Sequence, residues 1–145
     1  MIEQLDELYR EVILDHFREP RHAGELPGAP IRVEGANPLC GDEMTFSLIL
    51  DGDRIKAIRF KGTGCAISQA AASMLSEQAQ GKSIGEVRKL IEAMKRMMQG
   101  QPVDDQVDLG DLEALAGVRK FPVRVKCAAL SWNVLERGLT ARQAP

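Results

Sequence analysis

Three cysteines and one aspartate are the side chains of this sequence that could hold a metal ion. Cys40 and Asp42 stand close together in a segment rich in turn formers, between two predicted strands. Cys65 follows a Gly-Thr-Gly sequence where a predicted strand gives way to a helix, and free backbone N–H groups and the helix dipole would stabilise a thiolate there. Cys127 belongs to a predicted helix, which would hold its sulfur on a rigid support.

The chemistry of this donor set indicates zinc or iron. Three sulfurs and one carboxylate match the tetrahedral set that Zn²⁺ accepts, and three thiolates also suit the iron of a cluster. The soft sulfurs select the metal, whereas the harder carboxylate of Asp42 weakens one corner, which could open to admit a sulfur or to release a cluster. Bound zinc would leave a formal charge of about −2, which Lys61, Arg124 and Lys126 could offset.

Each of these residues has a simpler explanation when it is taken alone. A buried cysteine such as Cys127 often serves as a small apolar side chain, and Asp42 belongs to a type that is common in turns. Because the chain has no C-x-x-C pair, spacing alone identifies a candidate site without assigning it. The two histidines, His16 and His22, are interpreted as structural or solvated side chains and are left outside the site.

The composition is that of an ordinary globular domain. Of the 145 residues 44% are hydrophobic and 28% charged, so we expect one domain spanning residues 1–145 that folds without needing a metal. The formal net charge of −2 gives no field to attract nucleic acid or an anionic membrane, so protein partners are expected. No apolar run has membrane-spanning length and the first residues do not resemble a leader, which with three cysteines favours the cytoplasm.

Hydrophobic periodicity predicts the elements that must position these side chains. An amphipathic helix is followed by a surface loop, three short strands and a series of helices. The predicted helices cover residues 2–17, 65–80, 83–98, 109–116 and 122–138, the predicted strands cover 31–36, 44–50 and 54–61, and the loop covers 18–30. Strands first and helices afterwards favour an α+β fold, with the helices packed on one side of an antiparallel sheet.

Local signals predict where the helices begin and end. Ser83 with Glu86 three residues later makes a capping box at the start of one helix. Glycine is expected to stop the short helix at Gly117, and the last helix is expected to run to Gly138. Three methionines near residue 96 recur at helical spacing and are interpreted as core filling rather than as a soft-metal surface.

Four segments carry a further signal. They are Leu14-Asp15-His16-Phe17-Arg18-Glu19-Pro20-Arg21-His22-Ala23-Gly24, Asn37-Pro38-Leu39-Cys40-Gly41-Asp42, Gly62-Thr63-Gly64-Cys65-Ala66-Ile67-Ser68 and Val125-Lys126-Cys127-Ala128-Ala129-Leu130-Ser131-Trp132. Together they resemble the iron–sulfur cluster assembly scaffold family over most of residues 5–138. The resemblance implies a three-stranded antiparallel sheet covered by helices. It also implies that Cys40, Asp42, Cys65 and Cys127 bind zinc or, alternatively, an iron–sulfur cluster.

One position separates the branches of that family. Its general scaffolds carry a His immediately before the third cysteine, in a segment read by a chaperone, whereas this sequence has Lys126 there. The stretch between Cys65 and Cys127 is also longer, as in the zinc-bearing branch. The resemblance therefore favours a zinc-dependent sulfurtransferase that takes persulfide sulfur from a cysteine desulfurase and serves downstream cluster-assembly proteins.

Three functions remain to be compared. In the first, the protein accepts sulfur, and we expect Cys40 to be the acceptor because a loop cysteine moves more easily than cysteines fixed at helix positions. In the second, it is a non-enzymatic scaffold on which a nascent cluster is built at the same residues. In the third, it is a structural zinc domain, which is disfavoured because such sites usually use paired cysteines and no carboxylate.

Overall fold

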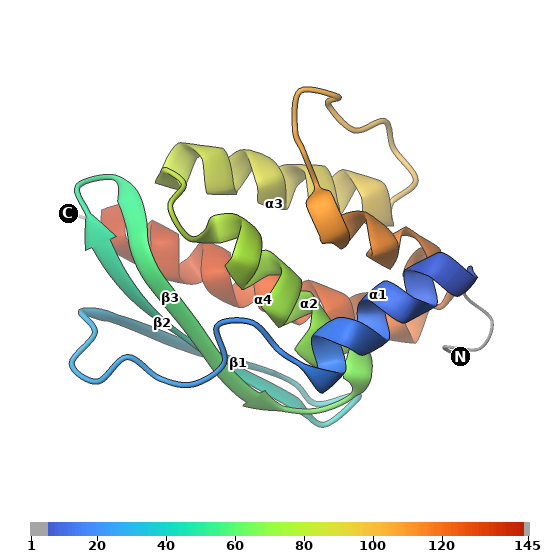
Figure 1. Cartoon of the computed structure of the whole chain (residues 1–145), viewed down its shortest axis with the longest axis horizontal. Coiled ribbons are helices and arrows are strands. Elements are labelled where there is room, and N and C mark those ends of the chain that lie inside the picture. Colours follow the sequence, from blue (N-terminus) through green and yellow to red (C-terminus); the bar gives the residue numbers. More distant parts are fainter. Residues whose placement is uncertain (1–5, 144–145) are drawn as a thin grey trace.

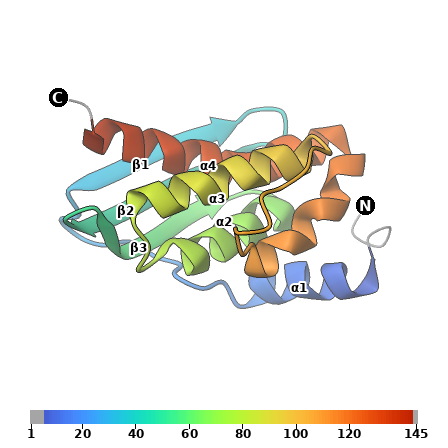
Figure 2. The same ribbon diagram turned by 90° about the horizontal axis from the view of Figure 1, so that it is seen from above.

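A three-stranded antiparallel sheet forms one layer of the molecule, and the helices cover one of its faces (Figures 1 and 2). The computed structural model describes residues 6–143. In chain order the elements are α1 (Glu7–Arg18), β1 (Ile31–Asn37), β2 (Asp42–Asp51), β3 (Arg54–Thr63), α2 (Ala66–Ala79), α3 (Ile84–Met98), the 3-10 helix η2 (Gly110–Lys120) and α4 (Pro122–Gln143). This architecture confirms the predicted α+β fold with a three-stranded antiparallel sheet.

Alternating side chains on the strands build the core beneath the helices. In β2 every second residue from Met44 to Leu48 is buried, and Phe46 stands opposite Phe60 of β3. The pairing of β1 with β2 places Asn37 opposite Asp42. The last residue of β1 and the first of β2 therefore meet at one end of the sheet.

Helix α4 packs closely on β1 because two glycines lie at the contact. A Cβ on Gly35 would stand 2.5 Å from Val134 Cγ2, and a Cβ on Gly138 would stand 2.9 Å from Val33 Cγ1. The predicted end of this helix at Gly138 is wrong, since α4 continues to Gln143. Gly138 has helical backbone and makes room for the strand instead of stopping the helix.

The helix before α4 also differs from the prediction. Its expected end at Gly117 is wrong, because η2 passes through that glycine to Lys120. The buried residues Leu112, Leu115 and Val118 recur at every third position, which aligns them along one face of a 3-10 helix. Burial of this face outweighs the glycine as a local stop signal.

The remaining helix signals agree with the structure. Ser83 Oγ accepts a hydrogen bond from the backbone N–H of Glu86 at 3.1 Å, and the Glu86 carboxylate accepts one from the Ser83 N–H at 3.1 Å, which confirms the capping box. Met94 and Met97 are buried, as expected for core residues. The predicted start of the first helix at residue 2 lies outside the described residues; Asp6 caps α1 by accepting from the Leu8 N–H.

The predicted surface loop lies along the outer edge of β3. The Phe60 N–H donates to the His22 carbonyl at 2.9 Å, and the Gly24 N–H donates to the Phe60 carbonyl at 2.8 Å. These bonds fasten the connection between α1 and β1 to the sheet. Among residues 6–143 no helix has the length and apolar character needed to cross a membrane.

Candidate metal centre

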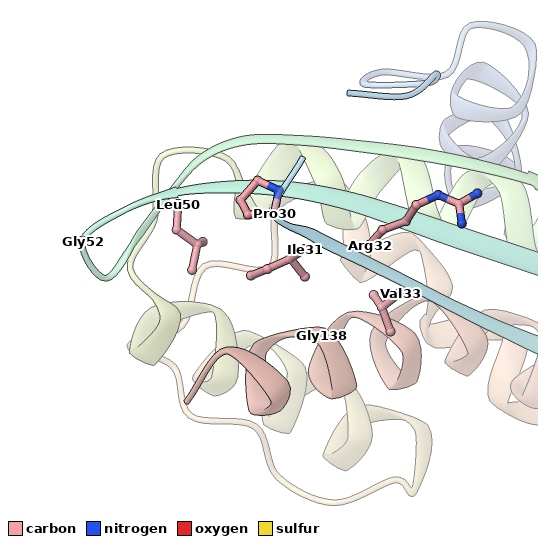
Figure 3. A pocket seen from close by; sticks show the side chains of 7 residues that line it. All are labelled: Pro30, Ile31, Arg32, Val33, Leu50, Gly52 and Gly138. Atoms are coloured by element: carbon pink, nitrogen blue, oxygen red, sulfur yellow. The ribbon is translucent and has the colours of Figure 1, made fainter. Parts of the chain in front are cut away.

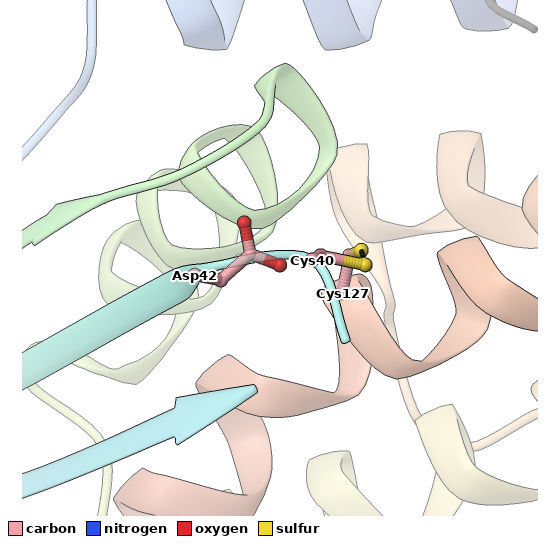
Figure 4. A group of neighbouring side chains, drawn as sticks. All are labelled: Cys40, Asp42 and Cys127. Carbon is pink, nitrogen blue, oxygen red and sulfur yellow. Dashed lines mark hydrogen bonds between the residues drawn. The ribbon is translucent and has the colours of Figure 1, made fainter. Parts of the chain in front are cut away.

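Loop, strand and helix ends converge at one end of the sheet. Cys40 lies in the connection between β1 and β2, Asp42 is the first residue of β2, and Cys127 lies in the first turns of α4. The potential ligand atoms of these three residues lie within 4.8 Å of one another (Figure 4). The packing of α4 on the sheet therefore brings Cys40 and Cys127, which are distant in the sequence, close together.

The two sulfurs in this group are in direct contact. Cys127 Sγ lies 2.7 Å from Cys40 Sγ, and both thiols are free. The carbonyl oxygen of Val123 lies 3.6 Å from the Cys127 sulfur and 4.0 Å from the Cys40 sulfur. Cys127 is fully buried and Cys40 is half-buried, so the pair has an inner and an outer member.

The Asp42 carboxylate is buried and held through one of its oxygens. Oδ1 accepts hydrogen bonds from the Cys65 N–H at 2.9 Å and from the Ser68 hydroxyl at 3.3 Å. Gly64, with a φ of +145°, leaves the space that Oδ1 fills, and a Cβ there would collide with that oxygen. The sequence led us to expect that N–H groups at this helix start would serve the Cys65 thiolate, but the Cys65 N–H binds Asp42.

The second oxygen of Asp42 has no such partner. Asp42 is 1% exposed, and within residues 6–143 its Oδ2 is buried without a hydrogen-bond partner. Burying a carboxylate oxygen that has no partner costs roughly several kcal/mol, as for other buried ions. A bound cation would compensate this cost. A buried carboxylate oxygen without a protein partner, beside free thiols, leaves a donor available to a cation, so this donor set fits a metal ion.

Electrostatics at the cluster support the same conclusion. Burial raises the pKa of the Cys127 thiol, and the neighbouring side chains of Cys40, Asp42 and Cys65 raise it further. The neighbouring acidic side chains thus disfavour ionisation of the buried Cys127 thiol. A divalent cation reverses this balance because it favours the deprotonated form of every ligand at once.

Cys65 stands beside this group. Its side chain lies close enough to Cys127 to raise the pKa of that thiol. It is half-buried and occupies the N-cap position of α2, and its sulfur is not among the atoms gathered within 4.8 Å. The fold brings Cys40, Asp42 and Cys127 tightly together and places Cys65 next to them.

The sequence offered three cationic side chains that could offset the charge of the site, and one of them lies at the thiols. The Arg124 Nη1 lies 3.9 Å from the Cys127 sulfur, and that contact, with the nearby charges of the other two cysteines, raises the pKa of Arg124. Lys61 instead pairs with Glu25 at 3.6 Å, and Lys126 is exposed. Arg124 is thus the cation of the three that the structure places at the thiols.

Two polar residues hold the ligands, and the sequence analysis did not single them out. The Asn37 side-chain N–H donates to the Cys127 sulfur at 3.9 Å, and Ser68 holds Asp42 as described above. Both are buried. A polar residue on the apolar face of a helix was a signal available for Ser68, whereas the role of Asn37 depends on the contact with α4.

His16 belongs to a second polar cluster. It is fully buried, with Nδ1 hydrogen-bonded to Ser73 Oγ at 2.8 Å and Nε2 to Asp111 at 2.8 Å. These bonds join α1, α2 and η2, and the Glu77 carboxylate lies close to them. Because both ring nitrogens have protein partners, this cluster agrees with the structural role expected for His16.

One cavity of the structure lies away from the cysteines. It has a volume of about 610 Å³ and is lined by Pro30, Ile31, Arg32, Val33, Leu50, Gly52 and Gly138 (Figure 3). Gly52 is in the hairpin turn at the far end of β2 from Asp42, about 30 Å along an extended strand. This cavity contains none of the candidate ligands.

Comparisons with known proteins place the chain among related sequences and folds. The family described as NifU-like N terminal domain matches residues 8–138. The zinc-dependent sulfurtransferase SufU of Bacillus subtilis (strain 168) is 47% identical over 139 residues, which cover 96% of this chain and 94% of that protein. The iron-sulfur cluster assembly scaffold protein IscU of Streptococcus pyogenes serotype M1 is 41% identical over 138 residues, covering 95% of this chain and 86% of that protein.

A solved structure shares the fold over nearly the whole domain. It is the crystal structure of a candidate iron-sulfur cluster assembly scaffold protein for the SUF system from Fervidobacterium islandicum AW-1. The TM-score is 0.84 and the sequence identity 36%, and the alignment covers 89% of this chain and 94% of that chain. Sequence and structure thus agree on the same group of relatives.

Proposed function

Because the chain belongs to the family of NifU-like N-terminal domains, we propose that it serves iron–sulfur cluster assembly by accepting persulfide sulfur from a cysteine desulfurase. The relative with 47% identity over nearly the whole chain is named a zinc-dependent sulfurtransferase. This supports sulfur acceptance over the scaffold function for which other relatives are named. Downstream cluster-assembly proteins would receive the sulfur. Three free thiols suit a protein kept in a reducing compartment such as the cytoplasm.

The ligands of the proposed zinc ion are Cys40, Asp42, Cys65 and Cys127. The observation that carries this assignment is the buried, unpartnered Oδ2 of Asp42 beside the thiols of Cys40 and Cys127. When bound, zinc would keep its cysteine ligands deprotonated at neutral pH, so no separate base is needed. Asp42 is fixed to the start of α2 through its other oxygen, which holds the ligands on β2 and α2 in a constant relative position.

Cys40 is the proposed sulfur acceptor. It is half-buried in a four-residue connection that contains Gly41 at a φ of +69°, whereas Cys127 is buried on a helix. The Cys40 thiolate attacks the terminal sulfur of the desulfurase persulfide, a new S–S bond forms on Cys40, and the old S–S bond breaks. The terminal sulfur keeps its proton and the partner's cysteine leaves as a thiolate, so the exchange needs no external oxidant or reductant.

The surface around Cys40 supports contact with a protein that carries the persulfide. Leu39, which precedes Cys40, is 67% exposed, and Val123, whose carbonyl touches both sulfurs, is 56% exposed. These two side chains offer apolar area next to the thiols to a docking protein. A desulfurase that docks here would exclude water from the exchanging sulfurs.

The competing function is that of a scaffold for a nascent cluster at the same residues. Relatives that are named scaffold proteins, such as the one from Streptococcus pyogenes, support this alternative. Lys126, an exposed residue immediately before Cys127, stands where the general scaffolds carry a ligand-type His, which weighs against it. Cluster-bearing protein is brown and zinc protein is colourless, so the absorption spectrum of the purified protein separates the two.

A serine substitution tests the acceptor directly. Zinc-loaded Cys40→Ser and the unaltered protein are each incubated with a cysteine desulfurase and cysteine, and sulfur on each cysteine is located by peptide mass spectrometry. We expect sulfur on Cys40 of the unaltered protein and none on the variant. Sulfur acceptance by Cys40→Ser at the normal rate would overturn the assignment of Cys40, and its zinc content, measured in parallel, shows whether the site is still loaded.

A further inference from the structure

The two sulfurs at the centre of the site differ in the hydrogen bonds that they receive. The Cys127 sulfur is approached by two N–H donors, Asn37 Nδ2 at 3.9 Å and Arg124 Nη1 at 3.9 Å. Within residues 6–143 the Cys40 sulfur contacts the Cys127 sulfur and the carbonyl of Val123, neither of which is an N–H donor. The inner sulfur is therefore the one that N–H donors approach.

Asn37 contacts both parts of the site that differ in this way. It is the last residue of β1, is 8% exposed and stands opposite Asp42 in the strand pairing. Its backbone carbonyl accepts from the Cys40 N–H at 3.2 Å, while its side chain donates to Cys127. One residue thus shapes the loop that carries Cys40 and contacts the sulfur of Cys127.

Hydrogen bonds from N–H groups change what a thiolate can do. They withdraw electron density from the sulfur, and a less basic thiolate is a weaker nucleophile, by about threefold for a tenfold change in basicity. Arg124 is half-buried and lies on the first turn of α4, whereas Asn37 is buried and uncharged and is fixed by the strand. Asn37 is therefore the donor whose position the fold fixes more firmly.

We propose that Asn37 is a positioning residue that holds the Cys127 sulfur in the metal centre and so leaves Cys40 as the thiolate that reacts. The inference rests on the proposed zinc site and deepens it, because it states which ligand stays and which one exchanges. It concerns the difference between the two sulfurs and does not require the desulfurase. It can therefore fail while the proposed sulfur transfer holds, and the reverse is also true.

The test uses a substitution of similar volume that removes the donor. Asn37→Leu fills about the same space, so the burial of Cys127 is kept, and Asn133→Leu makes the same change at an exposed position of α4 as a control. Zinc-loaded proteins are treated briefly with iodoacetamide, and the modification rate of each cysteine is measured by peptide mass spectrometry. Cobalt-substituted samples give the thiolate-to-metal charge-transfer band, which does not depend on access of the reagent.

We expect Cys40 to react faster than Cys127 in the unaltered protein and in Asn133→Leu. In Asn37→Leu the Cys127 rate should rise about threefold relative to Cys40, and the charge-transfer band should move to longer wavelength. A rate ratio and a band that both stay unchanged would overturn the inference. If Asn37→Leu does not fold, Asn37→Thr, which is too short to reach the sulfur, is measured in the same way with the same expectation.

Discussion

At the scale of single residues, the two oxygens of Asp42 have different surroundings. Oδ1 is bound by the Cys65 N–H and the Ser68 hydroxyl, and Oδ2 has no partner within residues 6–143. A carboxylate that is fixed at one oxygen and open at the other presents its free oxygen in a constant direction. This is how an outer group orients a metal ligand.

Replacing this carboxylate should weaken metal binding strongly. We expect Asp42→Ala to bind zinc more weakly by a factor above the roughly 10–100-fold that the loss of an outer hydrogen bond costs, because a ligand itself is lost. Competition with a chromophoric chelator measures the affinity. Asp53→Ala, at the exposed hairpin turn, is the matched control and should bind zinc as the unaltered protein does.

Residue types account for what the sequence could predict of this site. Thiols and a carboxylate have a chemistry that can be recognised without a structure, so the sequence offers all four as candidates, and the family resemblance is what implies that they are the ligands. Asn37 and Ser68 could not, because their importance comes from contacts with residues that are distant in the chain. The pairing of Lys61 with Glu25 was hidden for the same reason.

At the scale of elements, the contact between α4 and β1 positions Cys127. Gly35 and Gly138 leave no side chain at this contact, which lets the helix approach the strand. The approach brings the first turns of α4, which carry Cys127, against the end of β1, which carries Asn37. The same contact therefore supports both the core and the metal centre.

Replacing Gly138 or Gly85, which both lie in helices, by alanine should change the free energy of unfolding in opposite directions. We expect Gly138→Ala to lower the free energy of unfolding by about 1–3 kcal/mol, because the added Cβ would stand 2.9 Å from Val33 Cγ1. Gly85→Ala in α3 meets nothing nearer than 3.9 Å and should raise that free energy by about 0.5–1 kcal/mol. Urea denaturation measures both, and stabilisation by Gly138→Ala would show that the contact with β1 is not close.

The limits of sequence reasoning also lie at this scale. Strand alternation and the Ser83–Glu86 capping box are local signals, and they predicted β2 and the start of α3 well. Gly138 misled because glycine can serve as a stop signal or as a space for a neighbour, and Gly117 misled because burial of one face of η2 outweighs a local stop signal. Which use applies is decided by tertiary packing, so the ends of η2 and α4 could not be predicted locally.

At the scale of the whole molecule, the core does not depend on the site. Buried apolar side chains from the sheet, α2, α3 and α4 form one cluster that extends far beyond Cys127. A domain of this size usually buries enough surface to fold alone. Metal binding should therefore add stability to a chain that is already folded.

Removing the metal should lower the melting temperature without unfolding the protein. A ligand that binds the folded state stabilises it by about 2.7 kcal/mol when its free concentration is one hundred times its Kd. We expect the far-ultraviolet circular dichroism at room temperature to stay unchanged after chelation, while the thermal transition moves down and returns when zinc is restored. Loss of the dichroism spectrum on chelation would mean that the metal is needed for folding.

The native mass of the zinc-loaded protein, recorded after incubation with a cysteine desulfurase and cysteine, tests sulfur acceptance at the metal centre most directly. We expect the protein that carries zinc at the start of the reaction to gain the mass of sulfur, and peptide mass spectrometry to locate that sulfur on Cys40. A protein that keeps its zinc and gains no sulfur would contradict this expectation and would favour the scaffold function or a purely structural metal site.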